Sequence, residues 1–267
     1  MGVDPTASVH PTAVIEDGAV VGPNCSIGPY CVIGPQVQLA EGVVLHSHVV
    51  VAGITSVGAK TTIWPFASIG HAPQDLKYAG EPTRLEIGSG NRIREHATMN
   101  PGTVTGTGVT RVGDNNLFMM GTHVAHDCDL GSNIVMSNNA GLAGHCIVED
   151  RVILGAMSGV HQFVRLGRGS MLGGMAAVVA DVVPYSIVAG DRAHLAGLNL
   201  VGLKRAGAER EHIKGLRLAF DGLFGREGTL QDRVTAAADA HTDNPLVQEL
   251  VRFMSTSSQR SYTQPAD

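Results

Sequence analysis

The sequence predicts a parallel β-helix made of hexapeptide repeats, a triangular prism, followed by a small α-helical domain. Aliphatic residues recur at every sixth position, and glycine is abundant at 34 of 267 residues. After about residue 190 the six-residue pattern ends and the amino-acid composition changes. A period of six fits neither an amphipathic helix, with its 3.6-residue period, nor a simple alternating strand. It fits coils of about 18 residues, each with three short strands and an aliphatic side chain pointing inward from every side.

The first row of aliphatic residues supports a prism over residues 1–190. The row steps by six without exception through Val3, Val9, Ile15, Val21, Ile27, Ile33, Leu39, Leu45, Val51, Val57, Ile63 and Ile69. Glycine often follows, as in "VGPNCSIGPYCVIGP", and small residues let the chain bend tightly at the turns. Successive coils are expected about 4.8 Å apart, the usual separation of paired strands.

Two interruptions of the row predict loops that leave the prism. The pattern lapses in "HAPQDLKYAGEPTRLE", at about residues 71–86, and resumes at Ile87 in the same phase. A second lapse, "NPGTVTGTGVTR" at residues 100–111, shifts the phase. From Val112 a second row then runs in steps of six to Val178.

Residues 191–267 are expected to form a separate helical domain. This part is rich in Ala, Leu, Glu, Lys and Arg, and Ile213, Leu216, Phe220 and Leu223 recur at helical spacing. The final stretch, "STSSQRSYTQPAD", is expected to be frayed.

Charge and composition disfavour several classes of protein. A net charge of -5 gives no support to a nucleic-acid binder, which is usually strongly basic. The sequence has no run of 18 apolar residues and no basic segment followed by an apolar one at its start. We therefore expect no membrane span and no secretory signal, and a cytoplasmic location. The four cysteines form no CxxC pair, which disfavours a zinc ribbon, and free thiols are expected.

Histidines gather in and around the stretch "GTHVAHDCDLG". With an 18-residue coil, Asp127 and His145 should stack on adjacent coils, and His126 lies one position earlier. Gly144 should stack directly over His126 and leave the surface beside the ring open. The sequence therefore predicts a functional cluster here.

Two further histidines belong to the same region. Gly141 and Gly159 should stack over His123, and His161 falls two coils beyond Ala125. Four of the twelve histidines of the chain thus converge on three coils, beside an aspartate and a column of glycines. Such a column is what a cleft requires.

The cluster could hold a metal or transfer a proton. Imidazole is the commonest metal ligand, and some hexapeptide β-helix enzymes bind zinc for carbonic anhydrase chemistry. A catalytic zinc has three protein ligands, and no third ligand has an obvious place here. A general base needs only one histidine and an orienting carboxylate, and Asp127 adjoins His126. The sequence therefore favours a general base and predicts that the protein needs no metal or other cofactor. A zinc site remains the alternative.

Several stretches resemble one family, the UDP-N-acetylglucosamine O-acyltransferases that begin lipid A synthesis in Gram-negative bacteria. They are "QDLKYAGEPTRLEIG", "NRIRE", "THVAHDC", "NNAGLAGH", "VHQF" and "GLKR", in order from residue 74 to residue 205. The resemblance implies a left-handed helix and a homotrimer with sites between subunits. It also implies transfer of an (R)-3-hydroxyacyl group from acyl carrier protein to the 3-hydroxyl of UDP-N-acetylglucosamine.

The resemblance also implies roles for individual residues. His126 would be the general base, Asp127 its orienting carboxylate, and the Gly144 N–H a donor to the oxyanion. His123 would meet the 3-hydroxyl of the acyl chain. The positions implied to lie near the sugar, the phosphates or the nucleotide are Asp75, Lys77, His145, His161, Gln162, Asn199 and Arg205.

The resemblance implies that the residue at position 174, Gly174, determines the length of the acyl chain. A glycine at this position leaves the groove open, which suggests a long chain. Met171 and Met175 flank that position and could still close the groove, because methionine adapts its shape.

The chain departs from the family pattern near the nucleotide end. Val201 stands where an acidic residue is familiar, and Ala206 where a second arginine is familiar. "MNPGT" at residues 99–103 also differs from the expected basic version. The first two departures bear on how the uridine diphosphate is held, and on whether the sugar is N-acetylglucosamine or an analogue.

An acidic carrier protein requires a basic surface. Its candidate residues are Arg165, Arg168, Lys204, Arg205, Arg210, Lys214 and Arg217.

Three rival functions remain. The N-acyltransferase of the same pathway normally has an additional N-terminal domain, for which hexads beginning at Val3 leave no room. The others are a zinc carbonic anhydrase-like protein and a non-catalytic scaffold.

Overall fold

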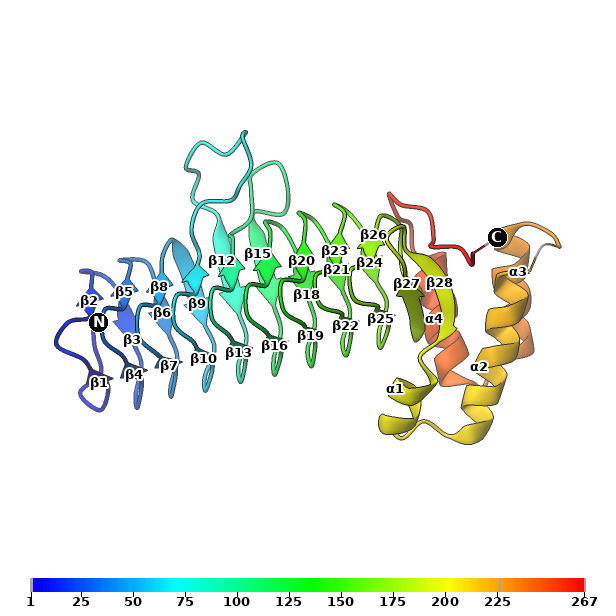
Figure 1. The fold of residues 1–267 in the computed structure, drawn as a ribbon, viewed down its shortest axis with the longest axis horizontal. Helices are drawn as coiled ribbons and strands as arrows, with labels where there is room; N and C mark the ends of the chain where they lie inside the picture. Colours follow the sequence, from blue (N-terminus) through cyan, green and yellow to red (C-terminus); the bar gives the residue numbers. More distant parts are fainter. Residues whose placement is uncertain (1, 226, 267) are drawn as a thin grey trace.

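The computed structural model describes residues 2–225 and 227–266, and it contains the parallel β-helix that the repeat predicts. Three sheets form the three faces of an elongated prism, and a helical unit lies at its C-terminal end (Figure 1). Neighbouring coils pair in parallel at a spacing of 18 residues, as Ser8 pairs with Ser26. The coil length expected from the row is therefore confirmed.

The strands of each face follow one another along the prism axis. The first face contains β1 (Ser8–Val9), β4 (Ser26–Ile27), β7 (Val44–Leu45), β10 (Thr62–Ile63), β13 (Arg92–Ile93), β16 (Leu117–Phe118), β19 (Val135–Met136), β22 (Ile153–Leu154), β25 (Met171–Leu172), β27 (Ser186–Ala189) and β28 (His194–Leu198). The second contains β2 (Val14–Ile15), β5 (Val32–Ile33), β8 (Val50–Val51), β11 (Ser68–Ile69), β14 (Thr98–Met99), β17 (His123–Val124), β20 (Gly141–Leu142), β23 (Gly159–Val160) and β26 (Ala177–Val178). The third contains β3 (Val20–Val21), β6 (Gln38–Leu39), β9 (Ile54–Val57), β12 (Arg84–Ile87), β15 (Val109–Val112), β18 (Asp129–Leu130), β21 (Ile147–Val148) and β24 (Arg165–Leu166).

The aliphatic rows form the core of the prism. Ile33, Ile63 and Leu154 have no exposed surface, and each such side chain stabilises the fold by about 1.5–3 kcal/mol. Val3 is 45% exposed, because it belongs to the outermost coil and no further coil covers it. The period of six is thus the period of inward-pointing side chains.

Both interruptions leave the prism as loops, and Figure 1 shows them projecting from the same side beside β12 and β15. Each loop ends three residues earlier than expected, because β12 starts at Arg84 and β15 at Val109. These two strands have four residues, longer than the usual two, and they pair with each other along their full length. The pairing extends the sheet beyond the hexad pattern into the bases of the loops.

The C-terminal unit begins later than expected. Residues 194–198 form β28, which pairs antiparallel with β27 and closes the prism. Four helices follow: α1 (Leu200–Arg205), α2 (Arg210–Leu223), α3 (Leu230–Ala240) and α4 (Pro245–Ser255). Leu216, Phe220 and Leu223 are buried on α2, as the helical spacing predicts. In the described part of the chain, no helix has the length and apolarity needed to cross a membrane.

The expectation of a frayed tail is wrong. Residues after α4 turn back onto the end of the prism, where Tyr262 pairs with Asp181 and Pro265 with Leu195 (red in Figure 1). Tyr262 also donates its hydroxyl to the Met254 carbonyl at 2.9 Å. Polar composition alone suggests fraying, whereas backbone pairing with the open edge of the last coil orders the segment.

Candidate active site

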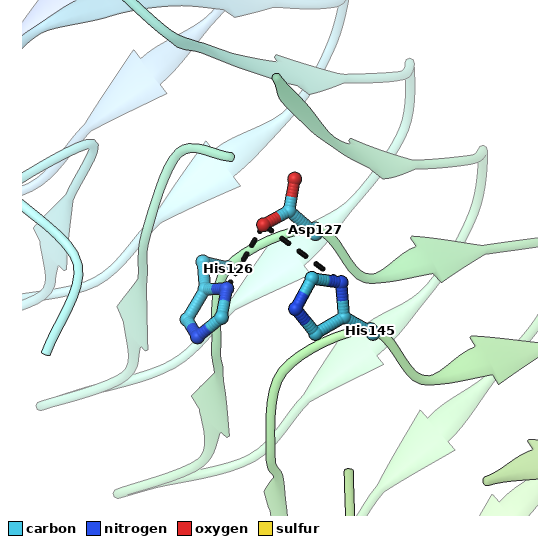
Figure 2. A group of neighbouring side chains, drawn as sticks. All are labelled: His126, Asp127 and His145. Atoms are coloured by element: carbon cyan, nitrogen blue, oxygen red, sulfur yellow. Dashed lines mark hydrogen bonds and ion pairs between the residues drawn. The ribbon is translucent and has the colours of Figure 1, made fainter. Parts of the chain in front are cut away.

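His126, Asp127 and His145 lie together on the outside of the prism, as coil spacing predicts (Figure 2). They occupy turns between the second and third faces, and Asp127 and His145 adopt left-handed conformations with φ of 57° and 63°. Aspartate and histidine are among the residues that tolerate this region. The Nδ1 atom of His126 lies 2.9 Å from Oδ2 of Asp127, and Nδ1 of His145 lies 3.9 Å from the same oxygen.

The second loop forms a cage around the Asp127 carboxylate. The Thr103 N–H and hydroxyl donate to it, the hydroxyl at 2.6 Å. The Thr107 N–H donates at 2.8 Å, with the Thr107 hydroxyl and the Gly108 N–H further out at 3.1 and 3.2 Å. Gly106 approaches so closely that an added Cβ would lie 2.3 Å from the carboxyl carbon.

The cage determines the charge of Asp127. Burial acts to raise the pKa of this carboxyl, but hydrogen bonds from Thr103 and His126 outweigh it and hold the pKa below its ordinary value. An ionised carboxylate only accepts hydrogen bonds, so the proton of a neutral His126 is on Nδ1. Its Nε2 is then an unprotonated base.

Gly144 leaves room for the His126 ring. A Cβ at this position would lie 2.5 Å from Cε1 and 2.7 Å from Nε2 of His126, so only glycine fits. Among the described residues, no acceptor takes the Gly144 N–H. The base and a free backbone donor therefore stand side by side.

The histidine cluster opens onto a cavity of about 590 Å³. Gly141 and Gly159 stack over His123 and form part of its wall, as predicted. The polar and glycine lining includes Gln74, His123, His126, Gly144, His161 and Gln162. Burial lowers the pKa of His123, and the positive charge of His126 when it is protonated acts in the same direction. The Nδ1 atom of His123 lies 2.7 Å from the Thr98 hydroxyl.

Only some of the residues predicted to lie near the sugar line this cavity. His161 and Gln162 line it, while Asp75 and Lys77 belong to the first loop and do not. Burial lowers the pKa of His145, whereas the charges of Asp127 and, more weakly, Asp75 oppose that shift. Asp75 is therefore within electrostatic reach of the cluster.

The predicted nucleotide positions cluster at α1. Asn199 caps this helix, since its Oδ1 accepts the Gly202 N–H at 2.9 Å and its amide donates to the Gly169 carbonyl. Arg205, in the last turn, is exposed, as is Val201, and Ala206 is the C-cap. The side chain of Asn199 thus already has a structural role.

The predicted acyl-length residues lie beyond the cavity. Met171 is in β25 on the first face, and Gly174 and Met175 are in the following turn, with Met175 68% exposed. None of the three lines the cavity of the single chain.

The cluster has the residue types of a metal site, but the Asp127 oxygens are not free to bind a metal. The ligand atoms of His126, Asp127 and His145 lie within 4.8 Å of one another. The Asp127 oxygens, however, already accept bonds from Thr103, Thr107 and the His126 ring, which use the lone pairs that a metal would need. This donor set favours proton transfer over zinc binding.

The sequence-based interpretation missed several neighbours of the cluster. Phe163 stacks on His145, with ring centroids 4.5 Å apart, and counting 18 residues from His145 would have found it. Thr103 and Thr107 had no such signal, because they lie in an insertion outside the repeat. Arg260, from the tail, contacts His161.

The prediction that Arg165 and Arg168 belong to an open basic surface is wrong. Arg165 is 8% exposed and pairs with the buried Asp181 at 2.7 Å. Arg168 pairs with Glu249 and Asp150. Both arginines therefore lie where α4 covers the end of the prism, and their charges are used in contacts there rather than on an open surface.

Comparisons with known proteins agree with this fold. A family described as "Bacterial transferase hexapeptide (six repeats)" matches residues 18–53, and "Udp N-acetylglucosamine O-acyltransferase; Domain 2" matches residues 181–263. The fold and these matches thus define a hexapeptide-repeat transferase with a left-handed parallel β-helix. More particularly, the chain belongs to the UDP-N-acetylglucosamine O-acyltransferase family.

Relatives and solved structures establish this membership. An acyl-[acyl-carrier-protein]--UDP-N-acetylglucosamine O-acyltransferase from Paracoccus denitrificans is 56% identical over 203 residues, 76% of this chain and 77% of that protein. One from Sinorhizobium fredii is 46% identical over 225 residues, 84% of this chain and 83% of that protein. The structure of LpxA from Acinetobacter baumannii is 40% identical with a TM-score of 0.88, covering 98% of this chain and 99% of that one.

Proposed function

We propose that this protein transfers an (R)-3-hydroxyacyl group from acyl carrier protein to the 3-hydroxyl of UDP-N-acetylglucosamine, the first step of lipid A biosynthesis. The observation that carries the proposal is the arrangement of His126 between the caged Asp127 and the free N–H of Gly144. Family membership supplies the substrates, since relatives are named for this reaction.

In the proposed reaction, Nε2 of His126 takes the proton of the sugar hydroxyl as its oxygen attacks the thioester carbonyl. The Asp127 carboxylate stabilises the imidazolium that forms. The Gly144 N–H donates to the oxyanion of the tetrahedral intermediate. The imidazolium then returns its proton to the departing thiolate of the carrier.

The assay that tests the proposal combines the purified protein, UDP-N-acetylglucosamine and a panel of 3-hydroxyacyl carriers, with the product identified by mass. A singly acylated UDP-sugar is expected. Acceptance only of a sugar with a free amine would favour N-acyl transfer or a 3-amino analogue. Activity that survives in metal-free, chelator-treated protein would exclude the zinc alternative.

We expect His126→Ala to reduce kcat/KM by at least about a hundredfold, the scale of general-base catalysis. His10→Ala is the matched control, because His10 is an exposed histidine in the first coils, far from the cluster. Full activity of a folded His126→Ala protein would contradict the proposal and favour a non-catalytic scaffold.

Homotrimeric assembly and acyl-length selection belong to the same proposal. The mass in solution is expected to be three times the 27.8 kDa of the chain. A methyl group added at Gly174 would meet only the Ala156 carbonyl, at 3.5 Å, which supports an open groove and a long acyl chain. A preference for a ten-carbon donor in the carrier panel would refute the long chain.

A further inference from the structure

The ordered tail brings an arginine to the wall of the cavity. Arg260 donates from Nε to the Gln162 carbonyl at 2.9 Å, and its terminal nitrogen lies 2.7 Å from Nδ1 of His161. His161 and Gln162 both line the cavity. A residue close to the end of the chain thus reaches the site because the tail pairs with the last coil.

The tail is held firmly enough to place this side chain. Asp181 exchanges backbone hydrogen bonds with Ser261 and Thr263, both at 2.8 Å, directly after Arg260. Thr263 is buried, and the Tyr262 hydroxyl bonds to the end of α4. The backbone of Arg260 is therefore fixed on one side by a strand pairing with the prism.

The contact determines which nitrogen of His161 carries a proton. A guanidinium has donors and no acceptor, so Nδ1 of His161 has to be the unprotonated acceptor. The proton of the neutral ring is then on Nε2. The competing contact from Nδ1 to the Gln162 carbonyl is longer, 3.4 Å, and that carbonyl already accepts from Arg260.

We propose that Arg260 is a positioning residue, which fixes His161 as the Nε2–H tautomer so that the ring donates a hydrogen bond to an acceptor oxygen of the substrates. Its kinetic consequence depends on the proposed function.

The test measures both the tautomer and the reaction. Two-bond ¹⁵N–¹H correlation spectra of histidine-labelled protein, with His161 assigned through His161→Gln, should show Nε2 protonated in the wild type and a mixture of tautomers in Arg260→Ala. The kcat/KM of Arg260→Ala should fall on the order of tenfold, the scale of one charge-assisted hydrogen bond. Arg260→Lys should recover part of both effects, because an ammonium still donates.

Gln259→Ala is the matched control, an exposed neighbour in the same tail, and should match the wild type. Equal thermal midpoints of all variants would show that the fold is intact, and equal amide-exchange protection at Asp181 and Thr263 would show that the tail stays paired. An unchanged His161 tautomer in Arg260→Ala, or an unchanged kcat/KM, would overturn the inference. If the wild type makes no acylated sugar, the proposed function fails, while the spectra still test the tautomer.

Discussion

At the scale of single residues, the proposed chemistry depends on one carboxylate, Asp127, whose surroundings keep it ionised. The Asp127 side chain has no exposed surface, yet its pKa is lowered, because Thr103 and Thr107 supply donors that replace water. Without these donors, burial would raise the pKa and the imidazolium at His126 would lose its partner.

Asp127→Asn should destabilise the fold in a pH-dependent way. The folded-state pKa of Asp127 is lower than the ordinary value of about 3.9, so its contribution to stability is complete above that pH and is lost as the pH falls through the folded value. The variant should therefore be less stable than the wild type by roughly 1–3 kcal/mol near neutral pH.

Denaturant titrations at several pH values check this prediction. The difference in the free energy of unfolding should narrow as the pH falls below about 4, the ordinary range of an aspartate. A difference that stays constant down to about pH 2 would show that the carboxylate is not stabilised by its cage. Asp129→Asn is a suitable control, since Asp129 is an exposed aspartate in β18.

At the scale of elements, the second loop is a part of the site that the repeat does not encode. Its backbone turns three N–H groups, from Thr103, Thr107 and Gly108, toward one carboxylate. The phase shift of the hexads marks where the loop begins, and the loop itself provides the cage.

Gly106→Ala should impair the reaction more than the fold. The added methyl group would lie 2.3 Å from the Asp127 carboxyl carbon, so the loop has to retreat and withdraw its donors. A displacement of about 1 Å at a catalytic group can cost on the order of a hundredfold, so we expect kcat/KM to fall at least tenfold. The thermal midpoint should fall by only a few degrees, because the Asp127 carboxylate loses donors while the prism core stays packed.

Val104→Ala is the control for the loop, because Val104 is 60% exposed in the same segment. It should retain the wild-type kcat/KM. Wild-type kinetics in Gly106→Ala would contradict a role of the cage in catalysis.

At the scale of the whole molecule, a rigid prism carries the cluster and a helical unit carries a basic groove. A cavity of about 760 Å³ beside α2 is lined by Lys204, Arg210, Lys214 and Arg217. After Arg165 and Arg168 are assigned to ion pairs, five of the predicted basic residues remain, and these are four of them. The fifth, Arg205, does not line the cavity. If the proposed function holds, this groove is the expected docking surface for an acidic carrier protein.

The double reversal Lys214→Glu and Arg217→Glu should raise the KM for the acyl carrier and reduce its dependence on salt. Like charges across an interface repel, and fewer attractive pairs remain for salt to screen. Initial rates from low to moderate ionic strength measure both effects. The matched control is the reversal of Lys60 and Arg92, two exposed cations of the prism. Equal KM values for both double variants would argue against this docking surface.

The sequence by itself determined the fold and the centre of the site. Because each coil has a fixed length of 18 residues, subtraction places His145 against Asp127 and Gly144 against His126 without coordinates. Periodicity converts positions in the chain into positions in space wherever the repeat holds.

Only the tertiary structure decided what lies where the repeat stops. The cage from Thr103 and Thr107, the burial of Arg165 and the approach of Arg260 all depend on segments outside the hexads. No period relates such segments to the prism. Their places depend on free hydrogen-bond donors, buried charges and an open strand edge that exist only after the coils have stacked.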